Sequence, residues 1–91
     1  MNVRNNEERS RYELVSGGRI VAIVDYIVRG DTLVVPHTEV DPQMRGRGLG
    51  AILVKETLDD VRRTGRTVVP ACWFVADFIE SHPEYGDLVA A

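Results

Sequence analysis

The most constraining feature of the sequence is an amphipathic segment, residues 49–65, that lies between two segments rich in β-branched residues. Its apolar side chains recur with the 3.6-residue period of an α-helix, and charged side chains occupy the opposite arc. A helix between two strands of one sheet makes a right-handed crossover between parallel strands. We therefore expect residues 32–40 and 66–72 to pair in parallel, without requiring hydrogen bonds along their whole length. The apolar arc consists of Leu53, Val54, Thr57, Leu58 and Val61, whereas Ile52 falls on the polar side.

Residues 10–29 predict a β-hairpin with a tight turn. Gly17 and Gly18 can adopt the positive φ that a two-residue turn needs, and the second arm, Arg19 to Arg29, is rich in β-branched residues. Gly30 and Asp31 predict the next turn, which leads into a third strand. The first half of the chain is therefore expected to form an antiparallel meander.

The third expected strand, residues 32–40, contains a proline that cannot donate a hydrogen bond to a neighbouring strand. At Pro36 this strand is expected to be paired on one side only, bulged, or both. Successive side chains of a strand point to opposite faces, so the residues divide into two sets. One set is Leu33, Val35, His37 and Glu39, and the other is Val34, Pro36, Thr38 and Val40.

The rest of the chain completes a small α/β (α+β) architecture. Residues 73–82 predict a second, shorter helix, and residues 84–91 predict a turn with a possible last strand. The polar opening, residues 1–9, is expected to be a flexible arm. Because 91 residues leave room for one domain, we expect a single domain over residues 1–91 with the order β-β-β-α-β-α.

Composition and charge exclude several classes of function. A net charge of −3 disfavours general nucleic-acid binding, which needs an excess of cations. No apolar run approaches the ~18 residues of a membrane span, and the N-terminus lacks the apolar core of a secretory signal. The single cysteine rules out an internal disulfide and fits a reducing compartment. We expect a cytoplasmic protein, monomeric or homodimeric, with no nucleic-acid or membrane partner.

The loop before the first helix, Arg45 to Gly50, alternates cationic and flexible residues. The first N–H groups of a helix need partners, and the loop contains no Ser, Thr, Asp or Asn side chain to supply one. Glycine allows a close backbone approach to a ligand, and a helix N-terminus attracts anions, as arginine does. The loop is therefore expected to cradle a phosphate or pyrophosphate, the alternative being a solvated glycine-rich turn. Neither the dinucleotide-binding fingerprint nor the P-loop pattern is matched.

These residues resemble the acyl-CoA signature of the GNAT N-acetyltransferase superfamily. The end of its strand corresponds to residues 40–42, and its loop corresponds to Arg45, Gly48 and Gly50. The segments HTEV, VVPAC and FVADFIESHPEY, in this order and spacing, are similar to the very small single-domain GNAT-like acetyltransferases. The resemblance extends over about residues 19–89.

The resemblance implies a minimal GNAT fold: an antiparallel β-meander followed by a helix, a splayed parallel strand and a second helix. It also implies acetyl-CoA or coenzyme A as cofactor, with the pantetheine arm in the wedge between the splayed strands. The backbone of Val40 would pair with pantetheine. Contacts to the pyrophosphate are expected from Arg45, Gly46, Arg47, Gly48, Leu49 and Gly50, although Arg47 can instead be plain surface charge. No metal site is expected.

Acetyl transfer to an amine needs a group that removes the amine proton, because a lysine-type amine has a pKa of ~10.4. His37 or Glu39 is the candidate base, directly or through water, and a backbone N–H near Val40 can polarise the acyl carbonyl. Cys72 follows the splayed strand as a nucleophile, a contact of the thioester or a buried small side chain. Tyr85 is the candidate acid for the leaving sulfur, unless it packs in the core.

This chain differs from typical members of the family at the acceptor site. Typical members carry N-terminal helices that build the acceptor site, and here strand follows strand through Gly30 and Asp31. The acceptor side is then open, supplied by a second subunit, or absent. The expected function is acetyl-CoA-dependent N-acetyl transfer to a small-molecule or peptide amine, directly within a ternary complex; the alternative is a non-catalytic acyl-CoA-binding or sensing module. Core or cleft-wall roles are expected for Trp73, Phe74, Phe78 and Ile79.

Overall fold

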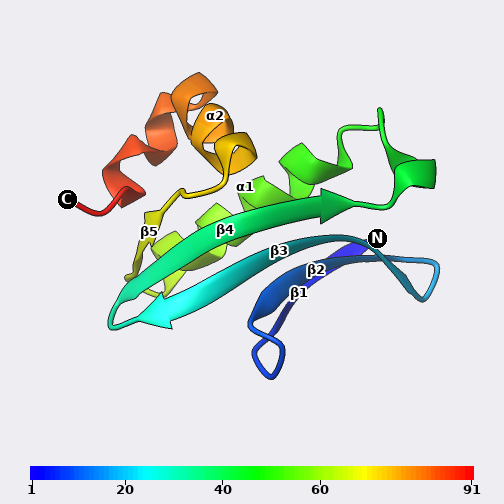
Figure 1. The fold of residues 1–91 in the computed structure, drawn as a ribbon, viewed down its shortest axis with the longest axis horizontal. Helices are drawn as coiled ribbons and strands as arrows, with labels where there is room; N and C mark the ends of the chain where they lie inside the picture. The colour runs from blue at the N-terminus through cyan, green and yellow to red at the C-terminus, as the bar shows by residue number, and fades with distance from the viewer.

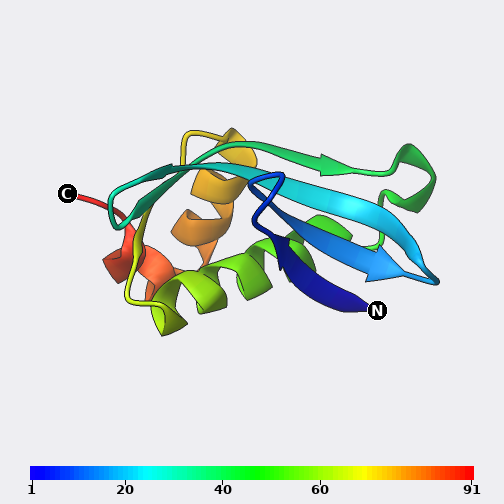
Figure 2. The same ribbon diagram turned by 90° about the horizontal axis from the view of Figure 1, so that it is seen from below.

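A computed structural model describes residues 1–91 as a curved five-stranded sheet with both helices on one of its faces (Figures 1 and 2). The strands lie in the order β1 to β5 across the sheet; β1 to β4 are antiparallel neighbours, and β5 is parallel to β4. The strands are β1 (Asn2–Asn6), β2 (Arg11–Ser16), β3 (Arg19–Arg29), β4 (Thr32–Val40) and β5 (Thr67–Val69). The helices are α1 (Leu49–Arg63) and α2 (Trp73–Ser81), with short 3₁₀ helices η1 (Pro42–Met44) and η2 (Pro83–Leu88).

Helix α1 forms the predicted crossover between β4 and β5. All five residues of the predicted apolar arc are buried, and Ile52 is exposed, as its place on the polar side predicts. The predicted hairpin turn is also present, with φ of 58° at Gly17 and 78° at Gly18. A cluster of 19 buried apolar residues fills the space between the sheet and the helices.

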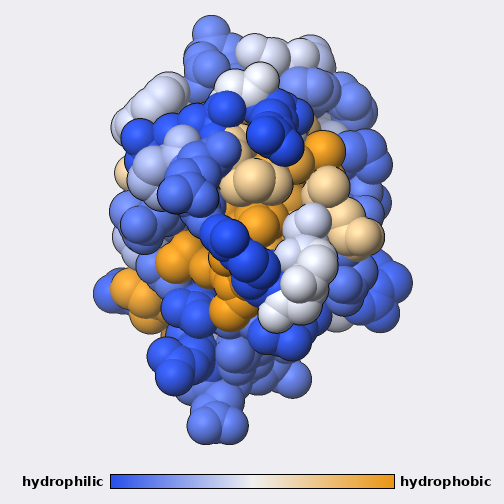
Figure 3. Space-filling view, turned by 90° about the vertical axis from the view of Figure 1, so that its right-hand side faces the viewer, coloured by the Kyte–Doolittle hydropathy of each residue, from blue (hydrophilic) through white to orange (hydrophobic).

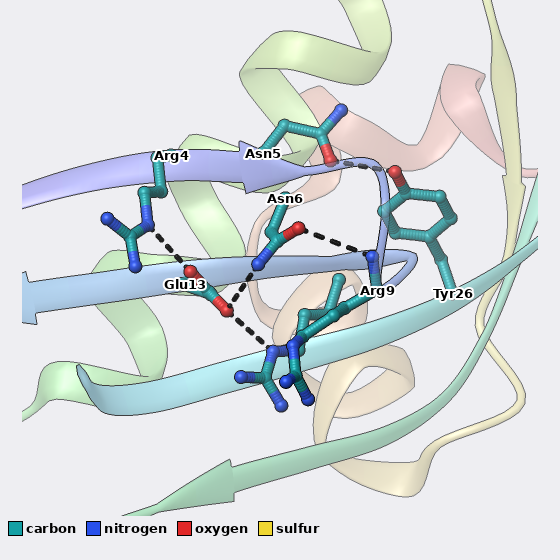
Figure 4. A network of polar contacts seen from close by, with 7 residues as sticks. Arg4, Asn5, Asn6, Arg9, Glu13 and Tyr26 are labelled. Atoms are coloured by element: carbon teal, nitrogen blue, oxygen red, sulfur yellow. Dashed lines mark hydrogen bonds and ion pairs between the residues drawn. The ribbon is translucent and has the colours of Figure 1, made fainter.

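The first residues form strand β1, which corrects the expectation of a flexible arm. Figure 4 shows the reason, a carboxylate on the face of the sheet away from the helices. The side chain of Glu13 is fully buried and accepts hydrogen bonds from Arg4 Nε (2.6 Å), Asn6 Nδ2 (3.1 Å) and Arg11 Nε (2.6 Å). Burial raises the pKa of Glu13, but these donors outweigh it and lower the pKa to about 2. Arg4 and Asn6 of β1 therefore form hydrogen bonds with the buried carboxylate of Glu13 on β2.

Strand β4 contains the irregularity that Pro36 predicts. In the register of β3 and β4, Asp25 lies opposite His37. Ile27, two residues further along β3, lies opposite Val34, three residues back along β4, so β4 carries one extra residue here. β5 pairs with β4 only as far as Val34, so β4 has a strand neighbour on one side only at this point. Both the bulge and the one-sided pairing are confirmed.

The bulge reverses the alternation of side chains along β4, and this corrects the predicted faces. Leu33 and Val35 are buried as expected. His37 and Glu39 do not continue that face, because their side chains are 53% and 59% exposed. Val40 instead packs against the core. An extra residue moves every later side chain to the opposite face, and the prediction had treated the strand as regular.

The residues after α2 form η2 in place of the possible last strand. A single parallel bridge between Val68 and Val89 is what remains of that strand. Helix α2 ends at Ser81, close to the predicted position. No helix in the structure combines the length and the apolar character needed to cross a membrane.

The end of the molecule that carries the loop before α1 has an apolar centre. Figure 3 faces this end and shows apolar side chains gathered in its middle, within a rim of polar ones. Among the exposed apolar residues, Ile20 at the start of β3 and Ile52 in the first turn of α1 belong to elements at this end. The loop therefore lies beside accessible apolar surface.

The buried ion pairs of Glu13 predict a pH-dependent contribution to stability. Glu13→Gln is expected to lower the free energy of unfolding by about 2 kcal/mol at pH 7, since it removes charge-assisted hydrogen bonds. The pKa of Glu13 in the folded protein, about 2, is below the ~4.3 of an unfolded glutamate. The contribution is therefore complete above pH ~4.3 and is lost as the pH falls towards 2.

Urea denaturation of both proteins at pH 7 and pH 3 measures this dependence. Glu8→Gln is the matched control, because Glu8 is exposed and makes no ion pair. The assignment would be contradicted if Glu13→Gln lowered the free energy of unfolding by the same amount at both pH values.

Candidate functional site

The parallel strands β4 and β5 separate after three residue pairs, the last of which joins Val34 and Val69. This is the splay that the resemblance predicts. Beyond it, the second half of β4, the start of α1 and the start of α2 enclose a groove of about 900 Å³. We call it the splay groove. Its lining residues are 36–40, 44–46, 48–51 and 71–74.

One end of the splay groove is the loop that leads into α1. Gly46 and Gly48 have φ of 81° and 72°, a conformation that side chains rarely adopt. Gly48 is the N-cap of α1, and no side chain caps the helix, as predicted. The first hydrogen bond of the helix runs from Ile52 N to Gly48 O (3.2 Å), so the N–H groups of residues 49–51 have no partner within the helix. Unpaired donors therefore face this end.

Close packing of α1 against α2 closes the inner side of the splay groove. A Cβ atom on Gly50 would lie 2.9 Å from Phe74 Cζ and 3.4 Å from Val40 Cγ2. The glycine thus lets the start of α1 approach the start of α2 and the end of β4. Arg45 also lines the groove and donates a hydrogen bond from Nε to the carbonyl oxygen of Val40 (3.4 Å), whereas Arg47 is not a lining residue.

The free edge of β4 forms one wall of the splay groove. Asp41 N donates to Val21 O (2.8 Å), and hydrogen-bonded and non-hydrogen-bonded pairs alternate along antiparallel strands. The next pair, Ala22 and Val40, is therefore of the non-hydrogen-bonded kind. The N–H and C=O groups of Val40, and of Thr38 two residues before it, point away from β3. They lie on the side where β5 has already diverged.

Cys72 lies in the opposite wall, at the N-cap of α2. Its backbone N donates to Val35 O (2.8 Å), and its Sγ donates to Thr38 Oγ1 (3.7 Å). Partial burial raises the pKa of the Cys72 thiol, but the backbone N–H groups of Val75 and Phe74 and the contacts with Thr38 outweigh it. The net pKa is lowered, as is usual for a thiol at a helix N-terminus. The structure therefore places Cys72 in the splay groove.

His37 and Glu39 lie together at the mouth of the splay groove. Both line it, and Nε2 of His37 is 3.3 Å from Oε2 of Glu39. Both are largely exposed, so water reaches the pair. The sequence indicated these two residues but not Thr38, because a regular strand would have turned the Thr38 side chain to the other face. The bulge at Pro36 turns Thr38 inwards.

Tyr85 is the one candidate catalytic residue that the structure does not bring to the splay groove. It is buried, and its hydroxyl donates to Asp59 Oδ1 (2.6 Å). This hydrogen bond, together with burial, raises the pKa of Tyr85. The guanidinium of Arg62 lies 5.9 Å from the ring centroid and also donates to Asp87. Tyr85 thus joins η2 to α1 within the core, which is the packing role expected as the alternative to an acid for the leaving sulfur.

The aromatic residues divide between the core and the splay groove. Phe78 and Ile79 are buried, as expected, and Phe74 is half-buried between the core and the groove. Trp73 lines the groove but is 77% exposed, so it has no core role. No cluster of three or more potential metal ligands is present.

Comparison with known proteins connects this site to a family. The sequence profile described as GCN5-related N-acetyl-transferase matches residues 11–88. Related proteins include NATD1 of Xenopus tropicalis, 26% identical over 84 residues, which cover 89% of this chain and 76% of the relative. Human NATD1 is 28% identical over 85 residues, which cover 89% of this chain and 74% of the relative.

Two solved structures have similar folds. A GCN5-like protein from Staphylococcus aureus aligns with a TM-score of 0.73 over 99% of this chain and 88% of its own, at 20% identity. The ribosomal-protein-S18-alanine N-acetyltransferase of Escherichia coli aligns with a TM-score of 0.66 over 85% of this chain, at 25% identity. The alignment covers 54% of that enzyme, so this chain corresponds to about half of its length. With the family profile matched over most of the chain and this fold around the splay groove, the protein belongs to the GCN5-related N-acetyltransferase (GNAT) family.

Proposed function

We propose that this protein is an acetyl-CoA-dependent N-acetyltransferase that transfers the acetyl group directly to an amine within a ternary complex. The observation that carries the proposal is the splay groove, which joins an unpaired strand edge to an uncapped helix N-terminus. Buried or half-buried backbone groups need hydrogen-bond partners. A ligand with amide groups can pair with the strand edge, and its phosphates can accept from the N–H groups at the helix start. Membership of the family supports coenzyme A as that ligand.

The donors of the splay groove fit the parts of coenzyme A. In our proposal the N–H and C=O groups on the free edge of β4, at Val40 above all, pair with the amides of pantetheine. The pyrophosphate contacts the loop and the first turn of α1, where positive φ and open space at Gly46 and Gly48 allow a close approach. Arg45 adds charge-assisted donors from the groove lining, and Arg47 is assigned the same role from the adjoining loop. The loop residues in this role are Arg45, Gly46, Arg47, Gly48, Leu49 and Gly50.

The residues of the splay groove outside the loop include a pair suited to proton transfer. Acetyl-CoA, when bound, supplies an acetyl group activated as a thioester. The His37–Glu39 pair is assigned to accept the proton of the amine, directly or through a water molecule, because it is exposed beside Cys72 and Thr38. Backbone N–H groups on the β4 edge are assigned to polarise the acyl carbonyl. Cys72 lies beside the acyl group as a wall contact, without carrying it.

Coenzyme A binding is the first test, and Gly48→Ala makes it specific to the loop. Ligand at 100-fold excess over Kd adds ~2.7 kcal/mol of stability, or a rise in Tm of roughly 10–20 °C for a domain of this size. CoA and acetyl-CoA are expected to give this rise, and NAD and ATP a much smaller one. Gly48→Ala is expected to weaken CoA binding about tenfold, the equivalent of one charge-assisted hydrogen bond.

The matched control is Gly30→Ala in the turn between β3 and β4. Gly30 also has a positive φ (61°) and open space around it, so the substitution carries the same backbone strain, about 1–2 kcal/mol, away from the splay groove. It should lower Tm and leave the CoA-induced rise unchanged. Absence of a rise with either CoA species, or an equal loss in both variants, would contradict the assignment. Binding without amine-dependent thiol release would instead identify a non-catalytic acyl-CoA-binding module.

Direct transfer predicts that Cys72 is dispensable for the chemical step. Cys72→Ala is expected to retain kcat within about tenfold, whereas loss of a covalent nucleophile costs ~10³-fold or more. Initial rates measured against both substrates should give intersecting double-reciprocal plots for the parent protein. Parallel plots together with an inactive Cys72→Ala would show that an acyl-cysteine intermediate forms. Cys72→Ser retains a hydroxyl near Thr38 and serves as the conservative control.

A further inference from the structure

Trp73 has the highest exposure among the large apolar side chains, at 77%. It is the first residue of α2, and the buried residues of that helix, Val75 and Phe78 among them, face the core instead. Its one ring contact is edge-to-face with Phe74, at 5.8 Å between centroids. Most of the ring is in contact with water, so packing within the chain does not account for its position.

The lining of the splay groove is uneven in charge, and Trp73 contributes aromatic surface to the part outside the cationic loop. Arg45 is the only lysine or arginine among the lining residues, and it lies at the loop end. The rest of the lining includes the exposed carboxylate of Glu39, from β4, and the indole of Trp73, from the start of α2. Asp77 is exposed one turn further along α2, on the same side of the helix as Trp73. Outside the loop, the groove therefore combines an aromatic face with negative charge.

An indole face next to carboxylates is suited to an alkylammonium chain. The ring attracts a cation through its quadrupole, and its apolar area packs against methylene groups. A single amine that must lose its proton to react does not benefit from this attraction in the reacting state. The attraction therefore favours an acceptor that carries a second, permanent positive charge on the same chain.

We infer that Trp73 is a specificity-determining residue that holds the acceptor, a primary amine on a flexible aliphatic chain with a second cationic group. The reacting amine lies near His37 and Glu39, and the second cation lies over the indole, within reach of Asp77. This inference rests on the proposed function for its role in turnover. The binding step can be measured on its own, because Trp73 is the single tryptophan of the chain.

Intrinsic fluorescence of the protein, with and without saturating CoA, measures the binding step. We expect 1,5-diaminopentane to change the Trp73 emission at concentrations about 5- to 30-fold lower than n-pentylamine does. A short Lys-Lys peptide with blocked ends distinguishes the peptide source of this chemistry from a free diamine. Equal affinities for diamine, peptide and monoamine, or no change in emission with any of them, would overturn the inference. The arm without CoA keeps this result independent of CoA binding.

Steady-state kinetics of two variants separate acceptor binding from cofactor binding. Trp73→Leu retains apolar bulk without the aromatic face, and Trp73→Phe is the matched control that retains one. Trp73→Leu is expected to raise the KM for the diamine about 5- to 30-fold, with a smaller change in the KM for acetyl-CoA and little change in kcat, and Trp73→Phe much less. A rise in the KM for acetyl-CoA as large as the rise for the diamine, or a fall in kcat at an unchanged diamine KM, would overturn the inference. Because Trp73 is exposed, both variants should unfold at the Tm of the parent protein.

Discussion

The divergence of β4 from β5 is the constraint on which the rest of the structure depends. The two strands pair over three residues and then separate, which leaves backbone N–H and C=O groups of β4 without a strand partner. Helix α1 starts beside this gap with its own N–H groups unpaired, and α2 starts on the other side. Unpaired backbone groups are costly when they are shielded from water, so this arrangement is stable only if solvent or a ligand completes it. The splay groove thus follows from the backbone before any side chain is considered.

Pro36 adds a second constraint, because its bulge decides which side chains face the splay groove. With one extra residue in β4, Thr38 turns towards Cys72, and His37 and Glu39 turn to the exposed mouth. A regular strand would have placed His37 in the core face with Val35. The same irregularity therefore keeps a polar pair accessible to water and brings a hydroxyl to the thiol. In the proposed enzyme the His37–Glu39 pair accepts the proton of the amine, and Cys72 and Thr38 lie beside the acyl group.

Local patterns in the sequence were sufficient to predict the elements that depend on neighbouring residues alone. The arc of α1, the Gly17-Gly18 turn and the uncapped start of α1 follow from periodicity, glycine conformation and missing cap residues, and all are present. Strand β1 was missed because its polar residues are partners of Glu13, and no local signal shows that a glutamate on another strand is buried. The face of His37 was wrong because the bulge was predicted without the reversal that it causes. Tyr85 packs in the core, one of the two places expected for it, but its hydrogen-bond partner, Asp59, could not be predicted because it lies 26 residues away.

The central claim is that the free edge of β4 and the first turn of α1 together hold coenzyme A. Amide chemical shifts in a ¹H–¹⁵N spectrum, recorded as CoA is added, test this most directly. The account predicts the largest changes at the amides of Thr38, Val40 and residues 46–51. A second, polar cavity of about 470 Å³ lies between β1 and the end of α1, lined by Tyr12 and Arg66 among others. Changes confined to that cavity, with the amides of Thr38 and Val40 unmoved, would contradict the account.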